Sequence, residues 1–87
     1  AIILVHLYGC PAEIENIKKI TKKHNIFLIE DCAQAHGAVY KDSKVGSFVD
    51  LSCFSFYPTK NITTGEGGMV ITNSLKIANK IIPTTKI

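Results

Sequence analysis

The chain has 87 residues, a formal net charge of +3 and 46% hydrophobic residues. This length suffices for one small domain with a thin core. No apolar run approaches the roughly 20 residues that a membrane span requires, so no membrane partner is predicted. The charge is modest and comes largely from lysines of one predicted helix. This pattern is more typical of a solvated helix face than of a nucleic-acid interface (Lys18, Lys19, Lys22 and Lys23).

The three cysteines are Cys10, Cys32 and Cys53, and they share no metal-ligand spacing. Each lies in apolar or strand-like surroundings. The arrangement predicts buried free thiols in a reducing, cytoplasmic compartment, with neither a disulfide framework nor a metal site.

An apolar run predicts a first strand over residues 2–7, followed by a turn and a helix that starts at Pro11. Proline suits the first helical position because its missing N–H has no helical partner there. The helix runs to Lys23, and Asn25 is a candidate left-handed stop. Its apolar face carries three isoleucines at helical spacing (Ile14, Ile17 and Ile20).

The second strand, over residues 26–29, is apolar throughout, which is typical of a central parallel strand. The helix before it forms a right-handed crossover from the first strand. Residues 32–50 are irregular apart from a hairpin at 41–44, and a third strand covers 51–56.

Residues 63–68 are predicted to form a turn, because they lack the spacing and the Lys-Ser/Thr pair of a P-loop. A fourth strand over 69–72 follows without a crossover helix, so it is antiparallel to the third. Asn73 or Ser74 caps a short last helix that ends at Pro83. The predicted fold class is therefore α/β, with part of a mostly parallel sheet flanked by helices and an antiparallel last strand.

Strands that are apolar on both faces need more covering helices than this chain supplies. We therefore expect residues 1–87 to be part of a larger protein. We also expect apolar sheet surface to be left bare where other segments would pack.

Two residues predict a catalytic site at the carboxyl ends of the strands. Asp31 ends the second strand, and ligands of open α/β sheets bind at that edge; a loop-capping aspartate is the alternative. Lys60 follows an aromatic strand and a proline turn, with a surface lysine as the alternative. A pyridoxal phosphate (PLP) site needs such a pair, because the amine forms a Schiff base with the cofactor and the carboxylate keeps the pyridine nitrogen protonated.

Other polar side chains are less specific. Ser55 shares a strand face with Cys53, where its hydroxyl could donate to a phosphate or bond to backbone. Glu30 points to the opposite face from Asp31, and we expect it at the surface or in support of the site.

Gln34 and the histidines complete the candidates. Gln34 and His36 follow the end of the second strand, and their small neighbours suggest close packing against something flat. His36, like His6 and His24, is expected to be structural or exposed rather than catalytic.

Together these segments resemble the DegT/DnrJ/StrS sugar aminotransferases, which are fold type I PLP enzymes. The resemblance covers most of the chain to about Asn73. Several blocks in the family's order are far more specific than one motif. The blocks are Val5–Gly9 with Pro11 and Ala12, Ile29–Ala38, Gly46–Phe48 with Asp50, Phe54–Asn61, and Gly65–Gly68.

The resemblance implies a role for four residues. Lys60 forms the Schiff base and moves the proton during transamination, and Asp31 pairs with the pyridine nitrogen. Gln34 contacts the phenolic oxygen of the ring, and Ser55 binds the phosphate. The implied reaction transfers an amino group from glutamate or glutamine to a nucleotide-linked keto-sugar, in amino-sugar and cell-surface polysaccharide biosynthesis.

The resemblance also implies that residues 1–87 are a partial large, PLP-binding domain, inactive alone. The upstream segment and the C-terminal small domain of such enzymes are absent from it, and their sites are built across a homodimer. Departures from the family pattern are Cys32 in place of Ala, the polar residues 61–64 and the end of the chain, 82–87.

Two alternatives remain open. The first is another fold type I PLP enzyme, such as a desulfurase or decarboxylase, which the block from Ser55 to Lys60 disfavours. The second is a non-catalytic domain that retains the fold to bind a ligand. The complete set that ends in Lys60 disfavours this second alternative, because a binding module has no need of the lysine.

Overall fold

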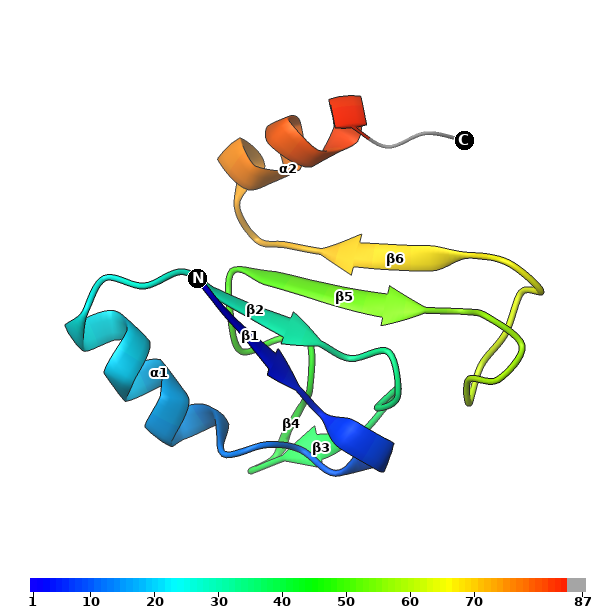
Figure 1. Cartoon of the computed structure of the whole chain (residues 1–87), viewed down its shortest axis with the longest axis horizontal. Coiled ribbons are helices and arrows are strands. Elements are labelled where there is room, and N and C mark those ends of the chain that lie inside the picture. Colours follow the sequence, from blue (N-terminus) through cyan, green and yellow to red (C-terminus); the bar gives the residue numbers. More distant parts are fainter. Residues whose placement is uncertain (85–87) are drawn as a thin grey trace.

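The computed structural model describes residues 1–84, which form a four-stranded sheet with a smaller two-stranded sheet beside it (Figure 1). The order of the large sheet is β1-β2-β5-β6. Its first three strands are parallel, and β6 is antiparallel to β5, which confirms the predicted fold class. The strands are β1 (Ile2–Val5), β2 (Leu28–Asp31), β5 (Leu51–Ser55) and β6 (Gly68–Ile71).

Helix α1 (Ile14–Lys23) connects β1 to β2. It starts later than predicted, because the backbone N–H of Ala12 donates to Nδ1 of His6 at 3.0 Å and holds the chain outside the helix. Asn25 has the predicted left-handed conformation, with φ 54°. The next backbone N–H, of Ile26, donates to the carbonyl of Thr21 at 2.8 Å, so β2 begins only at Leu28.

The predicted hairpin is confirmed as β3 (Val39–Tyr40) and β4 (Ser43–Lys44). Lys41 and Asp42 between them have φ 44° and 69°. Two left-handed residues are typical of the two-residue turn that matches the twist of paired strands.

The last helix, α2 (Leu75–Ile81), is capped by Ser74, whose Oγ accepts a hydrogen bond from the backbone N–H of Ile77 at 3.3 Å. The chain then passes through a short 3-10 turn (Ile82–Thr84) that contains Pro83. Both the cap and the end of this helix agree with the prediction.

One face of the sheet carries the core. Alternation along the strands turns Leu4 of β1 and Phe54 of β5 toward this face, where they pack against a buried cluster. The cluster consists of Ile14, Cys32, Ala35 and Val45. The predicted apolar face of α1 is fully buried at Ile14 but half exposed at Ile20.

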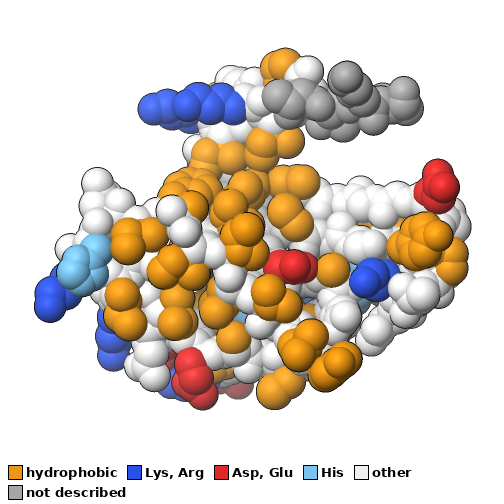
Figure 2. Space-filling model, viewed as in Figure 1, with side chains coloured by type: hydrophobic (Ala, Val, Ile, Leu, Met, Phe, Trp, Pro, Cys, Tyr) orange, Lys and Arg blue, Asp and Glu red, His pale blue; other side chains and the backbone are white. Residues whose placement is uncertain are grey.

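The opposite face of the sheet is open. Ile3 and Val5 of β1 are 63% and 47% exposed, and Val70 of β6 is 45% exposed. Figure 2 shows hydrophobic side chains gathered over the middle of the molecule. The expectation of bare apolar sheet surface is confirmed.

A buried carboxylate holds the covered face together. Glu30 is fully buried, so of the two positions expected for it, at the surface or in support of the site, the surface position is wrong. Its Oε1 accepts hydrogen bonds from His6 Nε2 at 2.9 Å and from the backbone N–H of Gly46 at 3.0 Å. Its Oε2 accepts from the backbone N–H of Phe48 at 3.2 Å and from Ser52 Oγ at 3.1 Å. Both oxygens are therefore fully engaged.

The partners of Glu30 are themselves fixed. Because Ala12 donates to Nδ1 of His6, the ring hydrogen is on Nε2 and points at the carboxylate. Gly46 has φ 94°, and a Cβ there would lie 2.7 Å from Cζ of Phe54, so only glycine fits. The single hydroxyl hydrogen of Ser52 is shared between Oε2 of Glu30 and the carbonyl oxygen of Gly46, which lies 2.8 Å from Oγ.

His6, Glu30 and Cys32 have ligand-type atoms within 4.8 Å of one another. The histidine and carboxylate atoms are occupied by hydrogen bonds, and burial raises the pKa of the Cys32 thiol to about 12. Deprotonated ligands are what a metal needs, so we interpret this cluster as structural.

We predict that Glu30→Gln destabilises the full-length protein containing this chain. Whichever oxygen it replaces, the new amide NH₂ would face at least one N–H donor that the carboxylate now satisfies, a loss of about 2–4 kcal/mol. Thermal unfolding followed by circular dichroism measures it. The control is Glu15→Gln, which removes an exposed charge paired with Lys41 (2.6 Å) and should leave the midpoint nearly unchanged. Equal shifts in both variants would contradict the role of Glu30.

Candidate active site

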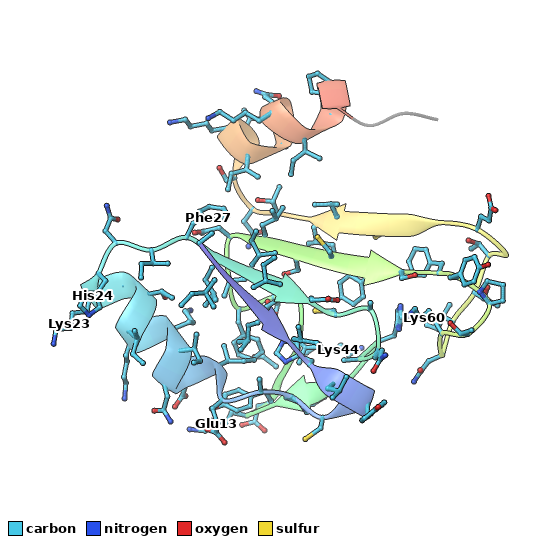
Figure 3. The ribbon with its side chains drawn as sticks, in the orientation of Figure 1. Glu13, Lys23, His24, Phe27, Lys44 and Lys60 are labelled. Atoms are coloured by element: carbon cyan, nitrogen blue, oxygen red, sulfur yellow. The ribbon has the colours of Figure 1, made fainter. Side chains whose placement is uncertain are left out.

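The candidate site lies at the edge of the sheet where the parallel strands β1, β2 and β5 end. Figure 3 shows Lys60 beyond this edge, whereas His24 lies at the opposite end of the sheet. Three segments meet here: a 3-10 turn after β1 (Leu7–Gly9), the loop after β2 (32–38) and the loop after β5 (56–67). The strand ends of a parallel sheet are where such folds bind ligands.

Asp31 faces the open side of the sheet, in register with Val5 of β1 and Cys53 of β5. Its Oδ1 accepts a hydrogen bond from the backbone N–H of Ala33 at 3.0 Å. Asp31 therefore does cap its own loop, which was the alternative to a catalytic role. Within residues 1–84, however, its Oδ2 has no hydrogen-bond partner, which leaves one oxygen for a ligand.

Gln34 joins the loop after β2 to the turn after β1. Its Oε1 accepts a hydrogen bond from the backbone N–H of Tyr8 at 3.1 Å, so its amide NH₂ remains to donate elsewhere. Tyr8 is held with φ 54° and ψ 33°, a conformation that few side chains other than Asn and Gly adopt readily. No local pattern in the sequence indicates this link between Gln34 and Tyr8.

A cavity of about 410 Å³ opens between these segments, lined by Tyr8, Gln34, Thr59, Lys60 and Asn61. Among the predicted site residues it brings Gln34 and Lys60 together, while Asp31 and Ser55 are not part of its lining. The backbone N–H of Lys60 donates to the carbonyl of Tyr57 at 2.9 Å, which fixes the proline turn. In the described part of the chain, Nζ of Lys60 has neither a hydrogen bond nor an ion pair.

Ser55, at the end of β5, is tied to the backbone. Its Oγ accepts a hydrogen bond from the backbone N–H of Tyr57 at 3.3 Å, and its own carbonyl accepts one from Nε2 of His36 at 2.8 Å. The hydroxyl hydrogen of Ser55 is still able to donate. Sequence reasoning missed the contact with His36, because nothing in the local pattern indicates a partner so far along the chain.

The glycine-rich residues 63–67 form the connection to β6, as predicted. The carbonyl of Phe56 accepts hydrogen bonds from Thr63 Oγ1 at 2.8 Å and from the backbone N–H of Thr64 at 3.0 Å. The backbone N–H of Phe56 donates to the carbonyl of Gly67 at 2.9 Å. These bonds close the turn on itself, so we do not interpret it as a phosphate cradle.

Comparison with known proteins places the chain in a family. Residues 1–85 match the model of the DegT/DnrJ/EryC1/StrS aminotransferase family, and the chain belongs to that family. The match continues beyond Asn73, so the expectation that the resemblance ends there is wrong.

Named relatives are sugar aminotransferases. The chain is 51% identical over 82 residues to GDP-perosamine synthase of Escherichia coli O157:H7, covering 94% of the chain and 22% of that protein. It is 50% identical over 82 residues to UDP-N-acetyl-3-dehydro-alpha-D-glucosamine 3-aminotransferase of Acidithiobacillus ferrooxidans, covering 93% of the chain and 22% of that protein. The chain thus spans about a fifth of the length of these curated relatives.

Solved structures agree with the fold. Helicobacter pylori PseC, an aminotransferase of pseudoaminic acid biosynthesis, matches with a TM-score of 0.91 and 40% identity over 94% of this chain and 22% of that one. NtdA of Bacillus subtilis, solved with bound cofactor PMP, matches with a TM-score of 0.81 and 30% identity over 92% of this chain and 18% of that one. Aminotransferases of this family depend on PLP, of which PMP is the aminated form.

The donor set at this edge fits such a cofactor. A phosphate needs hydrogen-bond donors, a pyridine nitrogen needs a carboxylate, and an aldehyde needs an unpaired amine. Ser55, Asp31 and Lys60 offer these groups on neighbouring strand ends. Neither α1 nor α2 has the length and apolar character of a membrane-spanning helix.

The cysteines around the site differ in their surroundings. All three are free; Cys32 is buried and Cys53 partly buried, but Cys10 is exposed, so the prediction that it is buried is wrong. Burial, and next the charge of Glu30, raises the pKa of Cys32 to about 12. Burial, and next the charge of Asp31 on the same sheet face, raises the pKa of Cys53.

We predict that Cys32 is the slowest of these thiols to react in the native protein. Only the thiolate is nucleophilic, and at pH 8 a pKa of about 12 leaves a fraction of about 10⁻⁴ in that form. Timed alkylation at pH 8 with peptide mass mapping gives the order, and a denatured sample should show all three labelled. Labelling of Cys32 as fast as Cys10 in the native protein would contradict its burial.

Proposed function

We propose that residues 1–87 are part of the large, PLP-binding domain of an enzyme that transfers an amino group from glutamate or glutamine to a nucleotide-linked keto-sugar. The observation that carries the proposal is the unpaired Nζ of Lys60 at the same strand-end edge as the free Oδ2 of Asp31. The relatives named above, which act in the formation of amino sugars, support the substrate class.

In this proposal each residue has a defined task. Asp31 would bind the pyridine nitrogen through Oδ2 and keep it protonated, while Ala33 holds the other oxygen in place. Gln34 would donate from its amide NH₂ to the ring oxygen, and Ser55 would donate its hydroxyl hydrogen to the phosphate. When bound, the cofactor supplies a conjugated ring that delocalises the electrons left at the donor's α-carbon.

Lys60 would hold the cofactor through its amine and then carry a proton. Once the incoming amino donor has released it from the cofactor, the amine would take the proton from the α-carbon of the donor and deliver it to the adjacent carbon of the cofactor, a general acid–base task. A side chain on a loop next to an open cavity can make this short movement, because Nζ is not held by another group in residues 1–84.

The intact enzyme would be a cytoplasmic homodimer. The cavity is open on one side and is lined by loops, which is consistent with completion by further segments and by the second subunit of a homodimer. Three free cysteines are consistent with a cytoplasmic location.

We predict that Lys60→Ala abolishes attachment of the cofactor. Borohydride treatment of the full-length protein with PLP should leave the cofactor's mass on the peptide that contains Lys60, and transamination should fall by about 10²–10⁴-fold in the variant. Lys44→Ala, an exposed lysine of β4, is the matched control and should behave like the parent. A parent protein that takes up no cofactor while folded would overturn the proposed function.

We predict that Asp31→Asn retains PLP but loses turnover. The near-isosteric amide can fill the same space but cannot keep the pyridine nitrogen protonated, so turnover should fall by about 10²-fold or more. Steady-state assays with glutamate and a nucleotide-linked keto-sugar test this, beside a PLP titration. Asp50→Asn, at the exposed residue that precedes β5, is the control. Near-normal turnover in Asp31→Asn would remove Asp31 from the site.

A further inference from the structure

We propose that His36 is a positioning residue for the phosphate-binding group of this site. It would act by holding the end of β5, and so the hydroxyl of Ser55, against the loop that follows Asp31. This inference rests on the proposed function, because it assigns a task toward the same cofactor. It adds a residue that makes no contact with the cofactor itself.

His36 and Ser55 are joined by a hydrogen bond whose direction is unambiguous. His36 Nε2 lies 2.8 Å from the backbone carbonyl oxygen of Ser55. A carbonyl oxygen can only accept, so the ring hydrogen is on Nε2 and His36 is the donor. The ring also packs between Phe54 and Phe56, with centroid distances of 5.5 and 5.8 Å, which fixes its plane.

The second nitrogen shows why packing alone does not explain a histidine here. Nδ1 of His36 is buried and has no hydrogen-bond partner in the described residues. A buried polar atom without a partner costs free energy, and phenylalanine would fill the same space between the two aromatic rings without that cost. What phenylalanine cannot supply is the donor at Nε2.

His36 lies in the loop after β2, which is hydrogen-bonded to the segments on both sides of it. Gln34, in the same loop, accepts from Tyr8 after β1, and His36 donates to Ser55 at the end of β5. The loop after β2 therefore fastens to the ends of both neighbouring strands through two side chains. Because Ser55 Oγ and the held carbonyl belong to the same residue, loss of the bond frees the hydroxyl more than it affects Asp31, whose carboxylate is fixed separately by Ala33.

The test compares PLP with pyridoxal, which lacks the phosphate, as ligands of the full-length protein. His36→Phe removes the donor and keeps an aromatic ring. It should weaken PLP binding by about tenfold, the effect of one hydrogen bond, and leave pyridoxal affinity within about twofold of the parent. His36→Gln places an amide donor near the position of Nε2 and should recover most of the PLP affinity.

Two controls separate positioning from general stability. His24→Phe makes the same change at an exposed site at the opposite end of the sheet and should alter neither affinity (Figure 3). In a Ser55→Ala background, His36→Phe should cause no further loss of PLP affinity, because the group that it positions is gone.

The binding results for the His36 variants decide whether His36 positions Ser55. Equal weakening of PLP and pyridoxal in His36→Phe, or no weakening of either, would overturn the positioning role. A His36→Phe variant that fails to fold leaves the decision to His36→Gln, which must then bind PLP within about threefold of the parent. Failure of the proposed function is a separate result, seen when the parent protein itself binds neither ligand.

Discussion

The fold depends on one buried carboxylate. Glu30 in the middle of β2 accepts hydrogen bonds from His6 after β1, from Ser52 of β5 and from the backbone of the loop before β5. A carboxylate inside a protein is costly unless its oxygens are paired, so these segments have to stay in place together. Four donors from three parts of the chain thereby hold the parallel strands and the loop at Gly46 in one arrangement.

The buried position of Glu30 also affects the candidate site, because side chains alternate between the two faces along β2. Residues that follow each other in β2 point to opposite faces, so the fixed direction of Glu30 also fixes the direction of Asp31. One carboxylate is enclosed and fully bonded, and the next is at the open face with an oxygen to spare. The same alternation in β5 places Ser52 with Glu30 and turns Ser55 toward the side of Asp31.

The open face gives the chain a clear asymmetry. The core, α1 and the hairpin occupy one side of the sheet, while apolar side chains of β1 and β6 lie bare on the other (Figures 1 and 2). The chain spans about a fifth of the length of its curated relatives. An uncovered sheet face beside a partly open cavity is consistent with that coverage. That further segments cover this face stays a prediction.

Features that depend on neighbouring residues could be predicted from the sequence alone. These features include the strand alternation, the hairpin at 41–44, the left-handed Asn25 and the Ser74 cap. Turn and cap chemistry acts over a few residues, so a local pattern is enough. The motif blocks likewise identified the family and singled out Asp31, Gln34, Ser55 and Lys60, whose roles remain predictions.

Features that join distant segments became visible only in the folded chain. For Glu30 the sequence left open a surface or a supporting position, and the structure buries it. The expected helix start at Pro11 and the expected burial of Cys10 were wrong. His6 lies 24 positions from Glu30 and His36 lies 19 from Ser55, so no window of local pattern contains both partners. A buried polar group is stable only where the fold brings its partner, and that partner is visible only once the chain is folded.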